Sequence, residues 1–171
     1  MPRDPAPARH AKLDHPRLRR SSALLAGAEP YAPAGTAASG LAFTYDGPFE
    51  YAVGGGVAVF DCDDDGRQDL YLAGGEGPAA LFLNASPDGG GLRFERRPDA
   101  VTDLDAVNGA YPVDVDNDGI ADLVTLRNGE NLALRGLGDC RFEPANDAWG
   151  LDGGDDMTEA FSATWEHGET L

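Results

Sequence analysis

Two stretches decide the fold: DCDDDGRQD at residues 61–69 and DVDNDGIAD at residues 114–122. In both stretches Asp occupies positions 1, 3, 5 and 9, and Gly occupies position 6. Carboxylates at alternating positions direct their oxygens towards one centre, and calcium is a hard cation that takes about six to eight oxygen ligands. The glycine permits the sharp turn that such a loop needs. Each stretch therefore predicts a calcium-binding loop.

An acidic turn without a metal is the alternative interpretation of either loop taken alone. Two copies that match at the same positions favour a metal, because crowded carboxylates repel one another and a divalent cation relieves that repulsion. Magnesium demands a stricter octahedron with retained waters, so calcium is the better match. The predicted ligands of the two sites are the side chains of Asp61, Asp63, Asp65, Asp69, Asp114, Asp116, Asp118 and Asp122, and the backbone carbonyls of Arg67 and Ile120.

Short apolar segments flank both loops and predict β-strands. Residues 57–60 lead into the first loop and residues 69–73 follow it, while residues 110–113 and 122–127 do the same around the second. Two further strands are expected after each loop, at residues 80–84 and 92–95 and at residues 130–134 and 140–143. The loops start 53 residues apart, and the two Arg-Phe-Glu triplets lie 48 residues apart. A period near fifty with about four short strands per unit is typical of β-propeller blades, so the predicted fold class is all-β, with blades of four antiparallel strands.

The helical EF-hand also uses Asp-rich calcium loops, but it is excluded on two counts. The flanking segments have the composition of strands rather than helices. Position 12 of the loop is Leu72 or Thr125 instead of the bidentate glutamate of an EF-hand. The loops therefore belong to a β-sheet repeat.

The composition indicates an acidic, turn-rich chain. Its 171 residues are enough for one modest domain, and its 23 Gly and 12 Pro suit many short strands. With 30 acidic against 13 basic residues the formal charge is −17, which disfavours nucleic acid and anionic membrane surfaces as partners. No apolar run is long enough for a transmembrane helix. No Ser-His-Asp spacing or nucleophile elbow suggests catalysis.

The sequence divides into a leader and a repeat region. Residues 1–40 are rich in Pro, Ala and Arg without a hydrophobic period, and predict a flexible leader without a convincing signal peptide. The repeat region, residues 41–171, opens with a strand expected at residues 41–45. It then holds blade 1 at about 54–97, blade 2 at about 108–145 and a partial blade at about 158–171. Because about four to eight blades close a propeller, we expect an N-terminal fragment of a longer protein or a truncated reading frame, with open blade edges that self-associate.

The two cysteines leave two interpretations open. Cys62 lies at position 2 of the first loop, where its side chain points away from the ion, and Cys140 lies in the second repeat. A disulfide between them is one interpretation, but two cysteines do not make a disulfide scaffold. Two small, partly buried thiols are the favoured prediction.

The sequence GVAVFDCDDDGRQDLY at residues 56–71 resembles the FG-GAP/VCBS repeats that build the β-propeller of integrin α-subunits. With the LFLN segment at residues 81–84 and the Arg-Phe-Glu triplets, residues 41–171 are most similar to bacterial relatives of the cartilage acidic protein family. The resemblance implies calcium loops between the first two strands of a blade, a structural role for the ion at the ligands given above, and a mostly extracellular or periplasmic location. Loop position 4, often Gly in the family, is Asp64 or Asn117 here, and both residue types tolerate the left-handed conformation that the turn needs.

The favoured function is a calcium-stabilised propeller module for protein–protein or protein–glycan interaction outside the cytoplasm, without catalytic activity. The alternative is a fragment of a propeller-type enzyme, a lyase or hydrolase, whose catalytic residues are not in this segment. The expected partner is a protein or glycan ligand. No nucleic-acid partner and no membrane insertion are expected.

Overall fold

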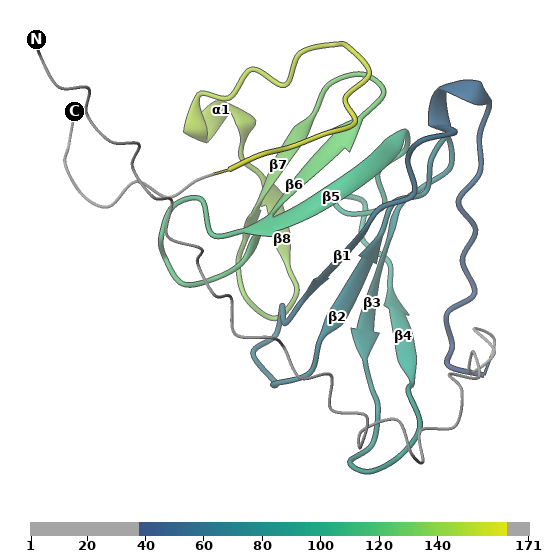
Figure 1. Ribbon diagram of the computed structural model, residues 1–171. Coiled ribbons are helices and arrows are strands. Elements are labelled where there is room, and N and C mark those ends of the chain that lie inside the picture. Colours follow the sequence, from purple (N-terminus) through teal and green to yellow (C-terminus); the bar gives the residue numbers. More distant parts are fainter. Residues whose placement is uncertain (1–37, 164–171) are drawn as a thin grey trace, which may run out of the picture. The chain divides into compact units, whose positions relative to one another are not determined.

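Two antiparallel sheets of four strands each dominate the computed structural model, which describes residues 38–163 (Figure 1). Strands are hydrogen-bonded in sequence order within each sheet, and a single compact unit contains both sheets. Sheet 1 contains β1 (Val57–Phe60), β2 (Asp69–Leu72), β3 (Ala80–Asn84) and β4 (Phe94–Arg97), and sheet 2 contains β5 (Val107–Val113), β6 (Asp122–Arg127), β7 (Leu132–Gly136) and β8 (Phe142–Pro144). The prediction of an all-β fold with four-stranded antiparallel blades is confirmed, and the two sheets do not close into a ring.

The remaining elements are short. The 3₁₀-helix η2 spans Phe49–Tyr51, and the helix α1 spans Asn146–Trp149 and ends at Gly150 with a φ of 64°. Within residues 38–163 no helix has the length and apolar character needed to cross a membrane. The predicted leader at residues 1–40 lies almost entirely outside the described residues, as do residues 164–171 of the predicted partial blade.

Two expected strands are not formed. Residues 41–45 run without a ladder and reach sheet 1 through one bridge, between Asp46 and Gly75. Their apolar side chains still pack, because Phe43 meets Phe82 edge-to-face with ring centroids 6.2 Å apart. The entry strand of the partial blade, expected at residues 160–165, is likewise not formed in its described part, residues 160–163, although a bridge joins Met157 to Asn128. An apolar alternation identifies a buried face, but a strand also requires a hydrogen-bonded neighbour along its length.

The main hydrophobic core lies between the two sheets. Side chains alternate along a strand, so β1 turns Ala58 and Phe60 towards sheet 2 and leaves Val57 and Val59 about half exposed. The ring of Phe60 meets Phe142 of β8 with centroids 6.3 Å apart. The other buried members include Tyr71, Leu81, Val107, Leu123 and Leu134. This core fixes the two sheets against each other and thereby positions both Asp-rich loops.

The opposite face of sheet 2 is apolar and only partly covered. Val113, Val124, Leu126 and Ala133 line a cavity of about 460 Å³ on this face. The segment after α1 runs along it, and Phe161 of that segment contacts Tyr111 with ring centroids 5.2 Å apart (Figure 1). Sheet 2 therefore buries one face against sheet 1 and presents the other to a short covering segment.

A disulfide joins the two sheets, so the prediction of free thiols is wrong. Cys62, after β1, and Cys140, before β8, are 78 residues apart in the sequence but have Cα atoms 4.7 Å apart. Packing of the sheets brings them together, and the Cys140 N–H donates a 2.9 Å hydrogen bond to the Cys62 carbonyl. Sequence spacing carries no information about this proximity, because it arises between repeats.

We predict that the Tyr71→Phe substitution destabilises the fold by about 1–2 kcal/mol at neutral pH. The Tyr71 side chain is fully buried, and its hydroxyl donates a 2.7 Å hydrogen bond to the Thr102 carbonyl in the connection between the sheets. Burial also raises the pKa of Tyr71 above its ordinary value of 10.0. The wild-type protein should therefore lose stability as the pH rises above 10.0, and the variant should lack this contribution.

Urea unfolding of both proteins at neutral and alkaline pH measures the effect. Tyr111→Phe is the matched control, because Tyr111 is 36% exposed. Equal losses of stability at neutral pH for the two variants would contradict the assigned role of Tyr71.

We also predict that replacing both cysteines with serine lowers the free energy of unfolding by about 2–4 kcal/mol, since the disulfide restricts the unfolded chain. Urea unfolding with and without a dithiol provides the measurement. The wild-type protein should approach the variant only when the dithiol is present. A wild-type protein that is equally stable in both conditions would argue against a stabilising cross-link.

Candidate metal centre

The two Asp-rich loops connect the first and second strands of each sheet and share the hydrogen bonds to their first aspartate. Asp61 accepts hydrogen bonds from the backbone N–H groups of Asp65, at 3.1 Å, and Gly66, at 2.8 Å. In the second loop Asp114 accepts the equivalent bonds, from Asp118 at 3.1 Å and Gly119 at 3.0 Å. The first aspartate therefore folds the loop back on itself in both repeats.

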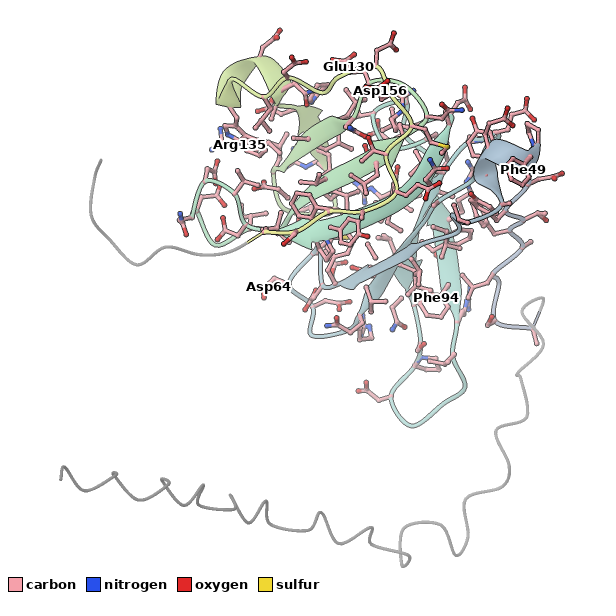
Figure 2. The ribbon with its side chains drawn as sticks, turned by 45° about the horizontal axis from the view of Figure 1, so that its top comes forward. Phe49, Asp64, Phe94, Glu130, Arg135 and Asp156 are labelled. Atoms are coloured by element: carbon pink, nitrogen blue, oxygen red, sulfur yellow. A yellow bond between two sulfur atoms is a disulfide. The ribbon has the colours of Figure 1, made fainter. Side chains whose placement is uncertain are left out.

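Two left-handed residues shape each turn. Position 6 is Gly66 with a φ of 84° or Gly119 with a φ of 89°. Position 4 is Asp64 with a φ of 59° or Asn117 with a φ of 58°. The prediction that Asp and Asn at position 4 tolerate the left-handed conformation of the turn is confirmed. Figure 2 shows Asp64 at the outer end of the first loop.

The aspartate at position 9 is buried in both repeats and anchors the loop to the sheet. Asp69 is 1% exposed and accepts hydrogen bonds from the N–H groups of Cys62, at 3.0 Å, and Asn84, at 2.8 Å. Asp122 is fully buried and accepts the same pair, from Val115 at 2.7 Å and Gly136 at 2.8 Å. The donors are position 2 of the loop and the last residue of the third strand. One carboxylate thus connects the loop, the second strand and the third strand.

Burial sets the protonation behaviour of these two groups. Desolvation raises the pKa of Asp69 and of Asp122 above the ordinary value of 3.8. The hydrogen bonds that each carboxylate accepts from two backbone N–H groups offset part of this rise. Neighbouring loop carboxylates add to it, Asp63 and Asp65 in the first loop. A cation beside these groups would stabilise the charged forms.

Each loop brings three of its predicted ligands together. The carboxylates of positions 1, 3 and 9 have oxygen atoms within 4.8 Å of one another in both loops. The carboxylate of position 5 lies outside each group. The two groups are Asp61, Asp63 and Asp69, and Asp114, Asp116 and Asp122.

Arginine side chains pair with carboxylates of both loops: with position 5 in the first loop, and with positions 3 and 5 in the second. Arg67 forms an ion pair with Asp65 and donates from Nε to the Asn84 carbonyl at 3.0 Å. In the second repeat Arg135 of β7 lies 2.9 Å from Asp116 and 3.6 Å from Asp118, and Figure 2 shows it beside that loop. The sequence analysis assigned Arg67 only a backbone carbonyl and missed Arg135. No local signal identifies Arg135, because sheet pairing brings it to the loop.

The donor set fits calcium. All the converging side-chain atoms in the two loops are carboxylate oxygens, the ligands that hard divalent cations prefer. Asp116 also has an oxygen, Oδ1, that is buried without a hydrogen-bond partner among residues 38–163. A bound cation would give this oxygen a partner. A third cluster, Cys62, Asp69 and Cys140, offers sulfur, but the disulfide engages both sulfur atoms.

We predict that calcium stabilises the protein more at pH 7 than near pH 4. In the metal-free protein the raised pKa of Asp69 and Asp122 means that their contribution to folding stability is fully present below about 3.8 and is lost as the pH rises through the raised pKa values. Bound calcium would oppose this loss, because it would interact with the ionised carboxylates. Thermal melting from pH 4 to pH 7, with calcium or with a chelator, measures the difference.

Asp122→Asn is the control variant, since its amide cannot ionise. The pH-dependent loss in the chelated protein should be smaller in this variant than in the wild type. A calcium effect of the same size at both ends of the pH range would contradict the prediction.

Comparison with known families agrees with this geometry. The family model described as FG-GAP-like repeat matches residues 61–125, which begin with the first loop and end in β6. Searches of curated proteins and of solved structures gave no match. The family match, the repeated loops and the four-stranded sheets together support an FG-GAP-like repeat at residues 61–125.

Proposed function

We propose that this chain is a calcium-binding β-propeller-type module, related to the bacterial relatives of the cartilage acidic protein family, in which calcium is structural. Its role is non-catalytic binding of a protein or glycan ligand outside the cytoplasm. The observation that carries the proposal is the repeated convergence of three carboxylates within 4.8 Å, one of them buried in the sheet. Two unrelated acidic surface turns would not share the same buried anchor.

The ion acts by joining parts of one sheet. In the first loop it is held by Asp61 and Asp63, which follow β1, and by Asp69, the first residue of β2. Asp69 is already bonded to Asn84 at the end of β3. Calcium thus connects the loop to three strands and neutralises charge that opposes folding. Asp65 and the carbonyl of Arg67 complete the proposed shell, with Asp118 and the carbonyl of Ile120 in the second.

An extracytoplasmic location agrees with the cross-link between the sheets. Disulfides persist in oxidising compartments and are rare where thiol reductants are abundant. Cys62 and Cys140 are 7% and 4% exposed, so the disulfide is part of the core. The formal charge of −17 also favours partners other than nucleic acid.

Apolar faces, rather than outer strand edges, are the proposed binding and self-association surfaces. The outer strand β4 carries Glu95, Arg96 and Arg97, and β8 has only three residues and includes Pro144. Charge, proline and short length discourage strand addition. Val57 and Val59 of β1, 51% and 49% exposed, offer an apolar surface on sheet 1.

We predict that the wild-type chain binds two calcium ions and that Asp63→Asn or Asp116→Asn each removes one. Each variant withdraws a converging carboxylate from one loop only. Calorimetric titration gives the stoichiometry. Thermal melting should show that calcium at 100 times its dissociation constant adds about 2.7 kcal/mol for each intact site.

Asp64→Asn is the matched control for Asp63→Asn. It removes the same charge from the neighbouring residue, keeps a residue that tolerates the φ of 59°, and reproduces the Asn117 of the second loop. It should retain both sites. A melting temperature that a chelator leaves unchanged, or equal losses of binding in the control and in Asp63→Asn, would refute the structural role of calcium.

A further inference from the structure

The two candidate calcium sites differ in what lies behind the buried aspartate. Oδ2 of Asp69 lies 3.0 Å from Sγ of Cys62 and 3.6 Å from Sγ of Cys140. The residue equivalent to Cys62 in the second loop is Val115, which lines the open apolar face of sheet 2. In the first site a disulfide therefore lies beside the buried aspartate, Asp69, and in the second site no disulfide lies beside Asp122.

The cross-link reaches the first loop from a turn of sheet 2 with unusual backbone conformations. Gly138, Asp139 and Cys140 have φ values of 74°, 52° and 54°. Left-handed conformations are unfavourable for residues other than glycine and persist only where the surroundings impose them. The turn is closed by hydrogen bonds from the Arg141 N–H to the Gly138 carbonyl and from the Leu137 N–H to the Arg141 carbonyl. The disulfide and the hydrogen bond from the Cys140 N–H to the Cys62 carbonyl join it to the first loop. Without the disulfide, the hydrogen bond and the packing of Cys140 and Phe142 in the core would hold this turn against the loop without a covalent link.

Cys62 connects the disulfide to Asp69, a predicted calcium ligand. Cys62 receives the hydrogen bond from Cys140 through its carbonyl, is covalently joined through its side chain, and donates its own N–H to Asp69 at 3.0 Å. Movement of Cys62 would displace a donor that holds the carboxylate. Partners that orient metal ligands typically contribute about 10- to 100-fold to metal affinity.

We propose that the Cys62–Cys140 disulfide positions Asp69 for calcium, so that its reduction weakens the first calcium site and leaves the second unchanged. The inference rests on the proposed function, because it concerns the regulation of the same sites. Cys62 and Cys140 are positioning residues and do not contact the ion.

The chemical step is thiol–disulfide exchange with a dithiol. A thiolate of the dithiol attacks one sulfur, the S–S bond breaks, and the second thiol of the reagent releases the other cysteine. The protein gains two electrons and two protons as Cys62 and Cys140 become thiols. The dithiol loses the same number and becomes a cyclic disulfide.

Two full-length variants report the sites separately. Asp116→Asn leaves the first site as the reporter, and Asp63→Asn leaves the second. Each is titrated with calcium by calorimetry, before and after reduction with dithiothreitol, and circular dichroism monitors the fold. We expect reduction to weaken calcium binding by about 10-fold in Asp116→Asn, and by less than about 2-fold in Asp63→Asn.

A third protein provides a control without redox chemistry. It combines Asp116→Asn with Cys62→Val, the residue type of the second loop, and Cys140→Ala. It should bind calcium as weakly as reduced Asp116→Asn and should not respond to dithiothreitol. Binding as tight as in oxidised Asp116→Asn would overturn the proposal.

The other outcomes separate the two proposals. Equal affinity of the first site before and after reduction, or equal weakening of both sites, overturns the positioning role alone. Absence of calcium binding by both oxidised single-site variants overturns the proposed function and the positioning role together.

Discussion

A carboxylate buried at the start of the second strand is the constraint on which both repeats depend. Asp69 and Asp122 are almost completely removed from water, yet each accepts two backbone hydrogen bonds that connect a loop to the end of the third strand. Burying a charge is costly unless partners compensate it. The N–H groups supply part of the compensation, and the loop directs further carboxylates to the same place. The fold thus concentrates negative charge at one place in each repeat, and the proposed calcium ion would compensate it.

The buried aspartate and its loop lie in different surroundings in the two repeats. Sheet 2 covers the inner face of sheet 1, so the residue at position 2 of the first loop, Cys62, lies in the core and is joined to Cys140. The equivalent Val115 lines a face that only a short segment covers. The two loops are similar in sequence, but the residues packed around them differ. The arginines that pair with the loop carboxylates also differ in origin. Arg67 belongs to the first loop itself, whereas Arg135 reaches the second loop from β7.

The loops and most strands were predictable because their determinants are local. Alternating Asp residues, a glycine at position 6 and apolar alternation on either side each act within about ten residues. The observed bounds of β1, β3 and β6 coincide with the expected ones. Residues 41–45 were a wrong prediction, because Phe43 packs on Phe82 without a partner strand to pair with. The pattern of apolar residues predicts which side chains are buried. Strand pairing depends on whether another strand lies alongside.

By itself, the sequence determined the two acidic loops, the left-handed residues Asp64 and Asn117, and the all-β class, since each depends on side-chain chemistry at short spacing. Only the tertiary structure decided that Cys62 pairs with Cys140 and that Arg135 of β7 meets Asp116 and Asp118 of the second loop. These contacts join residues from different strands or different sheets. Packing of the sheets determines such distances, and no spacing along the chain encodes them.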